Sequence, residues 1–208
     1  MPPRYKFIYF DMKGRGELTR LIFAQGRIEY DDYRITRERW LTEFKSKMPF
    51  QQIPVLEFDG HVLAQSQAIA AYAAEITGLC GATPLDRAKA RMFAEGAMEA
   101  YVEGAWYYFE SDKEKKAKLR EKFENDTLPR FRNNVEKLLA QNGSDDGWLV
   151  GSQLTYADLA VFHFFDGVQG LGMEATSSDT PQLARLLKKI KSEPNISQWL
   201  AKRPANPI

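Results

Sequence analysis

The chain has 208 residues, of which 44% are hydrophobic and 27% charged, a composition typical of soluble globular proteins. Its 29 basic and 28 acidic residues give a formal net charge of +1, and no basic stripe interleaves with aromatic residues, so no nucleic-acid partner is expected. The single cysteine, Cys80, excludes an internal disulfide framework, and with only two histidines beside it no metal site is expected.

The hydropathy pattern predicts a cytoplasmic protein. The first six residues lack the apolar core of a signal peptide. The most apolar run, near 157–165, contains Asp158 and is too short to span a bilayer, so no membrane partner is expected. A lone cysteine also fits a reducing compartment.

The first eighty residues alternate between strand and helix patterns. Residues 5–10 form a nearly continuous apolar run, typical of a strand covered on both faces. Asp59-Gly60 is a strong hairpin signal, and Ser66 is predicted to cap the following helix. The predicted order β-α-β-α-β-β-α indicates a small mixed sheet with helices on both faces. Its elements fall at 5–10, 14–26, 28–35, 37–47, the second half of 49–58, 61–64 and 66–78.

The pattern changes after a stretch at 77–84 that contains glycine and proline, which is interpreted as a linker. Beyond it no convincing strand is found, and Thr155 and Asp158 have the spacing of a helix capping box. Helices are predicted near 91–109, 115–141, from 154 onward, 183–192 and 196–202. The predicted fold class is an α/β domain followed by an all-α helical domain. The predicted boundaries are 1–79 for the α/β domain, 80–85 for the linker and 86–208 for the helical domain.

Several short segments each give weak evidence for a family, but their order and spacing together are specific. They lie at 5–10, 14–17, 50–56, 65–66, 154–158 and 199–204. With them, the whole chain resembles the cytosolic glutathione transferase family, and it looks most like the sigma class, which includes glutathione-dependent prostaglandin D synthases. The resemblance implies a thioredoxin-like domain that binds glutathione as cofactor, a helical domain that contributes the electrophile pocket, and a homodimer.

Tyr9 lies at the end of the first predicted strand, where open α/β sheets place ligand sites. A thiol with a pKa of about 8.5 is only ~3% thiolate at pH 7, and a hydroxyl that donates to the sulfur favours the thiolate. Because Tyr5 has the same strand parity, both tyrosines could instead be core aromatics. The resemblance implies that Tyr9 is catalytic. It also implies that Arg15, otherwise an ordinary first-turn charge, orients the phenol or the thiolate.

The remaining glutathione contacts are predicted at two turns. Gln65-Ser66 places a hydroxyl and helix N-terminal N–H groups where a carboxylate can bind, and the resemblance assigns this place to the γ-glutamyl end. The resemblance also implies a cis bond between Ile53 and Pro54, which would expose the backbone before the proline to the cysteinyl part of glutathione.

Trp40 and Lys45 resemble the family residues that hold the glycyl carboxylate, although packing and solvation are equally good interpretations of these two side chains. Gln52, also assigned to the glutathione site, stands where many sigma-class relatives have lysine. This departure weakens one expected charge contact.

Three glutamates, Glu95, Glu99 and Glu103, lie at intervals of four on one predicted helix face. Such a stripe is usually a solvated face. The resemblance implies that an acidic residue here reaches the ammonium group of the neighbouring subunit's glutathione, and Glu99 matches that position best. The pocket for the second substrate is predicted from Met12, Gly14, Trp106 and Tyr107, and aromatics on such a helix are otherwise core residues.

The expected function is a glutathione transferase that conjugates the glutathione thiolate to small hydrophobic electrophiles. Glutathione-dependent prostaglandin D isomerase activity is a second expectation, which the sigma-like resemblance suggests. Two alternatives stay open: a structural protein of the lens-crystallin kind, and a non-catalytic carrier of hydrophobic ligands. The absence of an active-site cysteine excludes a thioredoxin-type redox enzyme.

Overall fold

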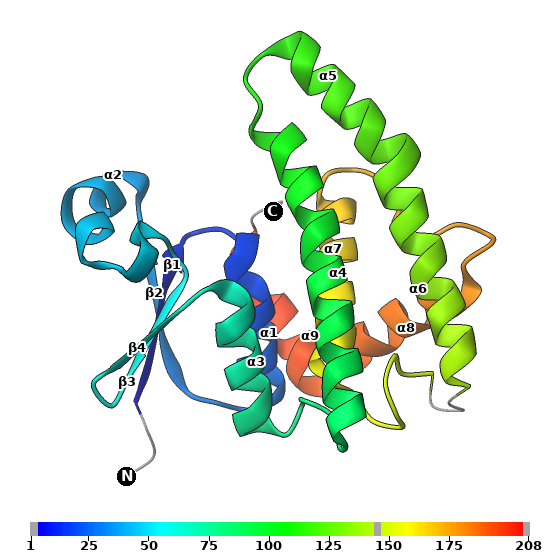
Figure 1. Ribbon diagram of the computed structural model, residues 1–208, viewed down its shortest axis with the longest axis horizontal. Helices are drawn as coiled ribbons and strands as arrows, with labels where there is room; N and C mark the ends of the chain where they lie inside the picture. The colour runs from blue at the N-terminus through cyan, green and yellow to red at the C-terminus, as the bar shows by residue number, and fades with distance from the viewer. Residues whose placement is uncertain (1–3, 144–146, 206–208) are drawn as a thin grey trace. The chain divides into compact units, whose positions relative to one another are not determined.

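The structure, a computed structural model, describes residues 4–143 and 147–205 (Figure 1). Residues 1–3, on which part of the signal-peptide expectation rests, lie outside these ranges. The chain divides into two compact units, one of Met1–Cys80 with Ser192–Ile208 and one of Gly81–Lys191. The first carries a four-stranded sheet and the second is built from helices, so the predicted fold class is confirmed.

The sheet of the first unit has the strand order β2-β1-β3-β4. The strand β1 (Tyr5–Phe10) lies inside the sheet, parallel to β2 (Tyr30–Ile35) and antiparallel to β3 (Val55–Phe58), and β4 (His61–Ala64) pairs with β3. The second strand begins at Tyr30, two residues later than predicted, because residues 26–28 still turn back onto α1 through backbone hydrogen bonds.

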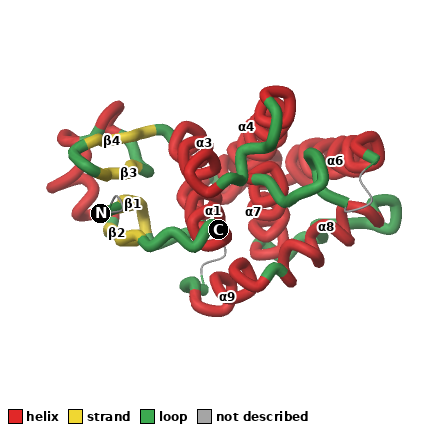
Figure 2. Tube along the Cα trace, turned by 90° about the horizontal axis from the view of Figure 1, so that it is seen from below, coloured by secondary structure: helices red, strands yellow, loops and turns green. Residues whose placement is uncertain are grey.

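Two helices of this unit, α1 (Glu17–Gln25) and α3 (Ser66–Thr77), pack together on one face of the sheet (Figure 2). Alternate β1 residues and the apolar faces of both helices form a core in which Phe7, Leu21 and Ile69 have no exposed surface. The crossover from β2 to β3 is a series of short turns: α2 (Arg37–Arg39), a π-helical turn (Trp40–Phe44) and two 3-10 turns (Lys45–Lys47, Pro49–Gln51).

The last helix, α9 (Pro194–Lys202), belongs by its contacts to the sheet-bearing unit, where it packs on α1. The domain division predicted from the sequence assigns this helix to the helical domain instead. Asn195 ties the two helices together, since its side chain donates to the carbonyl of Gln25 at 3.1 Å and accepts from Arg27 at 3.2 Å. Periodicity indicates an apolar face on α9 but does not say which unit that face covers.

The second unit consists of α4 (Pro84–Phe109), α5 (Lys113–Lys122), α6 (Leu128–Asn142), α7 (Tyr156–Gly170) and α8 (Pro181–Ser192). The long helix α4 packs along α7, which is buried over most of its length. The capping box predicted at the start of α7 is confirmed: Asp158 accepts from the N–H of Thr155 at 2.8 Å and from that of Leu149 at 2.9 Å. None of the helices in the described part of the chain is long and apolar enough to cross a membrane.

Two helix boundaries in this unit differ from expectation. Thr83 and Asp86 form a second capping box, so α4 begins at Pro84, inside the stretch interpreted as linker. The helix predicted near 115–141 is interrupted by a π-helical turn at Phe123–Thr127. Pro129 follows this turn and has no N–H to continue a regular α-helical ladder, which accounts for the wider turn before it.

Candidate active site

The end of β1 and the turn after it hold Tyr9 in one place. Its hydroxyl oxygen accepts a hydrogen bond from the backbone N–H of Arg15 at 3.1 Å, and the residue is 6% exposed. Gly14 and Gly16 allow this approach. A Cβ at Gly14 would lie 2.6 Å from the Tyr9 hydroxyl oxygen, and a Cβ at Gly16 would lie 2.6 Å from Cδ1 of the same ring. Gly14 also has a φ of +44°, which favours glycine. The position of the tyrosine ring therefore requires glycine at both 14 and 16.

The surroundings of Tyr9 suit it to donate a proton in a hydrogen bond. Burial raises the pKa of its hydroxyl, and the bond from Arg15 together with the charges of Arg15 and Arg20 opposes that rise. The phenol therefore keeps its proton at neutral pH. A hydroxyl that accepts one bond still has its proton to donate, and a thiolate is a good acceptor for it.

A cavity of about 410 Å³ lies in the same unit. Its lining residues are Phe10, Arg15, Trp40, Lys45, Gln51, Gln52, Ile53, Pro54, Gln65 and Ser66. All but Phe10 and Gln51 belong to the set predicted from the sequence to bind glutathione or act in catalysis. Sequence reasoning missed Phe10 because it belongs to the apolar run of β1, and it missed Gln51 because nothing in the pattern indicated its positive φ of 49°.

The cis bond predicted between Ile53 and Pro54 is present, immediately before β3. The two glutamines across the cavity are joined, since Nε2 of Gln65 donates to Oε1 of Gln52 at 3.4 Å. Gln52 thus contributes an amide, and no charge, to this side of the cavity.

The start of α3 also faces this cavity, but Ser66 is not its cap. Ser66 is the first residue of the helix and is 7% exposed, while Gln65 occupies the cap position with a φ of 72° and no capping bond from its side chain. The reason is that the chain turns sharply between β4 and α3. The N-terminal N–H groups of a helix of this length favour a bound carboxylate.

The residues predicted for the second substrate lie in both units. In the first, Met12 is half-buried and Gly14 is buried beneath the Tyr9 ring. In the second, Trp106 is 59% exposed, whereas Tyr107 is 6% exposed and its ring packs 5.8 Å from that of Phe123. Burial leaves Tyr107 little surface to offer a substrate, and the exposed Phe109 on the same helix offers more.

The three glutamates on α4 have different surroundings. Glu95 is paired with Arg91 at 3.6 Å, and Glu103 accepts from the hydroxyl of Thr127 at 2.7 Å. Glu99 is exposed and lines a groove of about 250 Å³ on the helical unit, together with Met92, Phe93, Arg130 and Phe131 among others. Glu103 lines the same groove and is paired with Lys122 at 3.1 Å. The predicted role of Glu99 stays a prediction.

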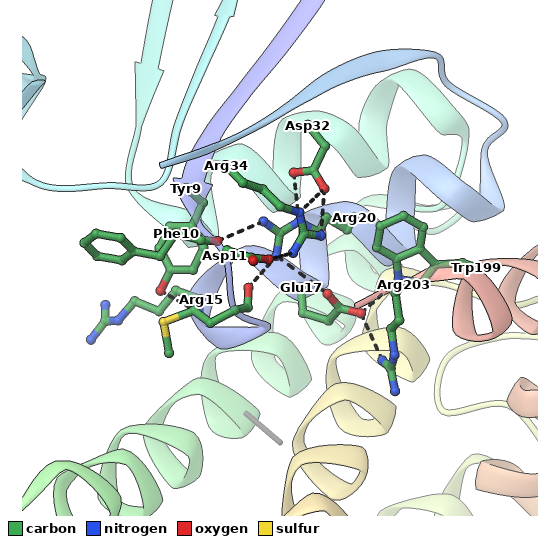
Figure 3. Close-up of polar contacts among 11 residues, drawn as sticks. Tyr9, Phe10, Asp11, Arg15, Glu17, Arg20, Asp32, Arg34, Trp199 and Arg203 are labelled. Carbon is green, nitrogen blue, oxygen red and sulfur yellow. Dashed lines mark hydrogen bonds and ion pairs between the residues drawn. The ribbon is translucent and has the colours of Figure 1, made fainter. Parts of the chain in front are cut away.

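Sequence reasoning also missed a partly buried polar network next to Tyr9 (Figure 3). It consists of Glu17 and Arg20 from α1, Asp32 and Arg34 from β2, and Trp199 and Arg203 at the end of α9. The spacing of Glu17 and Arg20 gave no signal, because an acidic and a basic residue three apart usually lie on a solvated helix face.

Comparisons with known proteins agree with this geometry. A family profile described as "Glutathione S-transferase, N-terminal domain" matches residues 5–75, and one described as "Glutathione S-transferase, C-terminal domain" matches residues 100–203. Glutathione S-transferase 1 of Ascaris suum is 36% identical over 99% of both chains. The chain belongs to the glutathione S-transferase family. The N-terminal profile of this family covers every residue that lines the cavity.

The names of other relatives state different roles. Hematopoietic prostaglandin D synthase of Gallus gallus is 33% identical over 99% of this chain and 100% of its own, and S-crystallin SL11 of Nototodarus sloanii is 31% identical over 97% of both. The crystal structure of the glutathione S-transferase from Ascaris lumbricoides superposes with a TM-score of 0.83 at 34% identity, over 99% of this chain and 100% of that one.

Proposed function

We propose that the protein is a glutathione transferase that conjugates the glutathione thiolate to small hydrophobic electrophiles. The observation that carries the proposal is the Tyr9 hydroxyl, which accepts a bond from the Arg15 N–H at 3.1 Å and therefore has its own proton to donate. Arg15 lines a cavity of about 410 Å³, within the range expected for a small-molecule site.

Each end of glutathione has a matching group in this cavity. Lys45 and Trp40 are proposed to hold the glycyl carboxylate, and the N-terminus of α3 at Ser66, with the Gln65 amide, is proposed to hold the γ-glutamyl carboxylate. The backbone at Ile53, before the cis proline, is proposed to pair with the cysteinyl part. Gln52 then contributes an amide contact, through Gln65, in place of a charge.

Tyr9 is proposed to donate its proton in a hydrogen bond to the sulfur and so favour the thiolate. Lowering the thiol pKa by ~2 units requires about 2.7 kcal/mol of preference for the charged form, which is within the reach of a charge-assisted hydrogen bond aided by a nearby arginine. The thiolate then attacks the electrophilic carbon, a carbon–sulfur bond forms, and the leaving group departs with its electron pair. Met12, which follows β1 and is half-buried, is proposed to contact the apolar part of that substrate.

A homodimer is proposed as the working form, with Glu99 of one subunit directed to the glutathione ammonium of the other. Phe50, which is 75% exposed, supports an interface, because aromatic side chains are enriched at protein contacts. The groove around Glu99, lined by Met92, Phe93 and Phe131, offers apolar surface for such a contact. A cytoplasmic location is proposed with it, since reduced glutathione requires a reducing compartment.

The relatives named prostaglandin D synthase favour a second activity. In it, the thiolate would attack one oxygen of a prostaglandin endoperoxide, the O–O bond would break, and loss of a ring proton would expel the thiolate unchanged. Supplying the endoperoxide with glutathione and resolving the products tests this: a product mixture equal to the uncatalysed one, or stoichiometric loss of glutathione, contradicts it.

The relative named S-crystallin keeps a non-catalytic alternative in view. The Tyr9–Arg15 arrangement favours catalysis, because a structural protein or a ligand carrier has no need of a buried hydroxyl poised to donate. Turnover of a generic aryl halide with glutathione decides between them. The proposal predicts conjugation that depends on Tyr9, and a protein that binds glutathione but conjugates no faster than the buffer contradicts it.

A further inference from the structure

Arg20 lies next to Tyr9 in the polar network (Figure 3). It has no exposed surface, and its guanidinium carbon is 5.8 Å from the centre of the Tyr9 ring. Its Nη1 donates to the carbonyl of Met12 at 2.6 Å and its Nη2 to that of Phe10 at 3.3 Å. One guanidinium therefore stabilises the turn that follows Tyr9 through two backbone carbonyls and places a positive charge next to the phenol.

The charge of Arg20 is shared between two carboxylates. Asp32 on β2 accepts from its Nε at 3.0 Å and is also paired with Arg34 at 2.8 Å. Glu17, which is 1% exposed, lies 3.7 Å from its Nη1 through Oε2. Glu17 is thus the buried negative charge that competes with the Met12 carbonyl for Arg20.

Two groups from the end of α9 satisfy Glu17 on its other oxygen. The indole N–H of Trp199 and Nη1 of Arg203 both donate to Oε1, each at 2.9 Å. A charge-assisted pair of this kind stabilises the carboxylate where it is. Because these two groups hold Glu17 in place, Arg20 keeps its short hydrogen bond to the Met12 carbonyl. The positive charge of Arg203 also balances the negative charge that Glu17 adds to the network.

We propose that Glu17, Trp199 and Arg203 form a positioning relay, through which the C-terminal helix sets the charge and the place of Arg20 next to Tyr9 and so favours the glutathione thiolate. None of the three lines the cavity, so they are positioning residues and not catalytic ones. The proposal rests on the proposed function, because the thiolate it concerns is that of bound glutathione.

An electrostatic relay has a signature that a purely structural tie does not have. Removing the positive charge of Arg203 leaves the network more negative and raises the pKa of the bound thiol, whereas removing the negative charge of Glu17 lowers it. A loss of packing alone would move both variants in the same direction. For partly screened charges inside a protein, a shift of about 0.3 to 0.6 pH unit in each direction is expected.

The experiment is an ultraviolet titration of the thiolate of bound glutathione in the full chain. The variants are Arg203→Gln, Glu17→Gln and the double substitution. We expect a raised thiol pKa in the first, a lowered one in the second, a value near that of the unsubstituted protein in the double, and a KM for glutathione within twofold throughout. Trp199→Phe, which removes only the N–H donor, is expected to give a smaller rise.

Arg27→Gln is the matched control. It removes a positive charge just after α1, at the exposed contact of Arg27 with Asn195 of α9, and is expected to leave the thiol pKa unchanged. Where Glu17→Gln does not fold, Arg203→Lys decides: restoring the charge is expected to recover most of the shift that Arg203→Gln causes.

Shifts of the same sign in the two single variants, or none beyond that of the control, overturn the relay. An unsubstituted protein that does not lower the thiol pKa of bound glutathione at all overturns the proposed function instead, so the two failures are distinguishable.

Discussion

Gly16→Ala is a steric test of the Tyr9 site that changes neither charge nor donor. Gly16 has a φ of −86°, which alanine adopts without strain, so the effect of the methyl group is one of space alone. That methyl group would lie 2.6 Å from Cδ1 and 3.1 Å from Cγ of the Tyr9 ring, about 1 Å closer than ordinary contact allows. Both atoms are near the ring's attachment to the backbone, so the ring cannot swing away without moving its hydroxyl.

A shift of that size breaks the 3.1 Å bond from Arg15 to the Tyr9 hydroxyl. Misplacement of a catalytic group by ~1 Å costs on the order of 10²-fold in rate, so we expect kcat/KM with an aryl halide to fall by about that factor. Gly167→Ala is the control, because its methyl group would meet nothing within 4 Å. A Gly16→Ala protein with the activity of the control would refute the conclusion that the turn positions Tyr9.

Three further predictions concern pH, folding and assembly. Burial raises the pKa of the Tyr9 hydroxyl, so Tyr9 keeps its proton up to about pH 10. We therefore expect kcat/KM to rise with pH as the glutathione thiol ionises, with no fall caused by Tyr9 below about pH 10. A fall of kcat/KM near neutral pH would contradict this. Asp158→Ala removes the capping box and leaves the N–H of Leu149 unpaired, so the free energy of unfolding measured in urea should fall by about 2–3 kcal/mol. A fall below about 0.5 kcal/mol would contradict the role of the cap. Glu99→Ala should weaken glutathione binding measured by calorimetry, and a monomer by sedimentation that keeps full activity would disprove the shared site.

The sequence was sufficient for the order of elements and for most of the cavity. The hairpin at Asp59-Gly60 and the capping box at Thr155 are local signals, and both appear in the structure where the pattern indicates them. Strand and helix periods indicated the elements in order, but the bounds differ at β2 and α4. The cavity residues were found by their resemblance to a family, since a cis proline and a helix N-terminus carry a site only once the chain brings them together.

What the sequence could not supply were contacts between distant segments. Glu17 and Trp199 are 182 residues apart, and no local period connects them. The contacts that place α9 with the sheet-bearing unit are of the same long-range kind, so the sequence pattern did not indicate them. Tyr107 and Trp106 are neighbours in the sequence but differ in burial, and helical period alone does not say which of the two faces the core.

The thiol pKa of glutathione bound to Tyr9→Phe, followed by ultraviolet absorbance of the thiolate, tests the central claim most directly. The substitution keeps the ring and removes only the hydroxyl that Arg15 holds. The account predicts glutathione binding close to that of the unsubstituted protein, a thiol pKa returned toward about 8.5, and turnover lowered at least tenfold, or about 1.4 kcal/mol. A thiol pKa equal in the two proteins would contradict it.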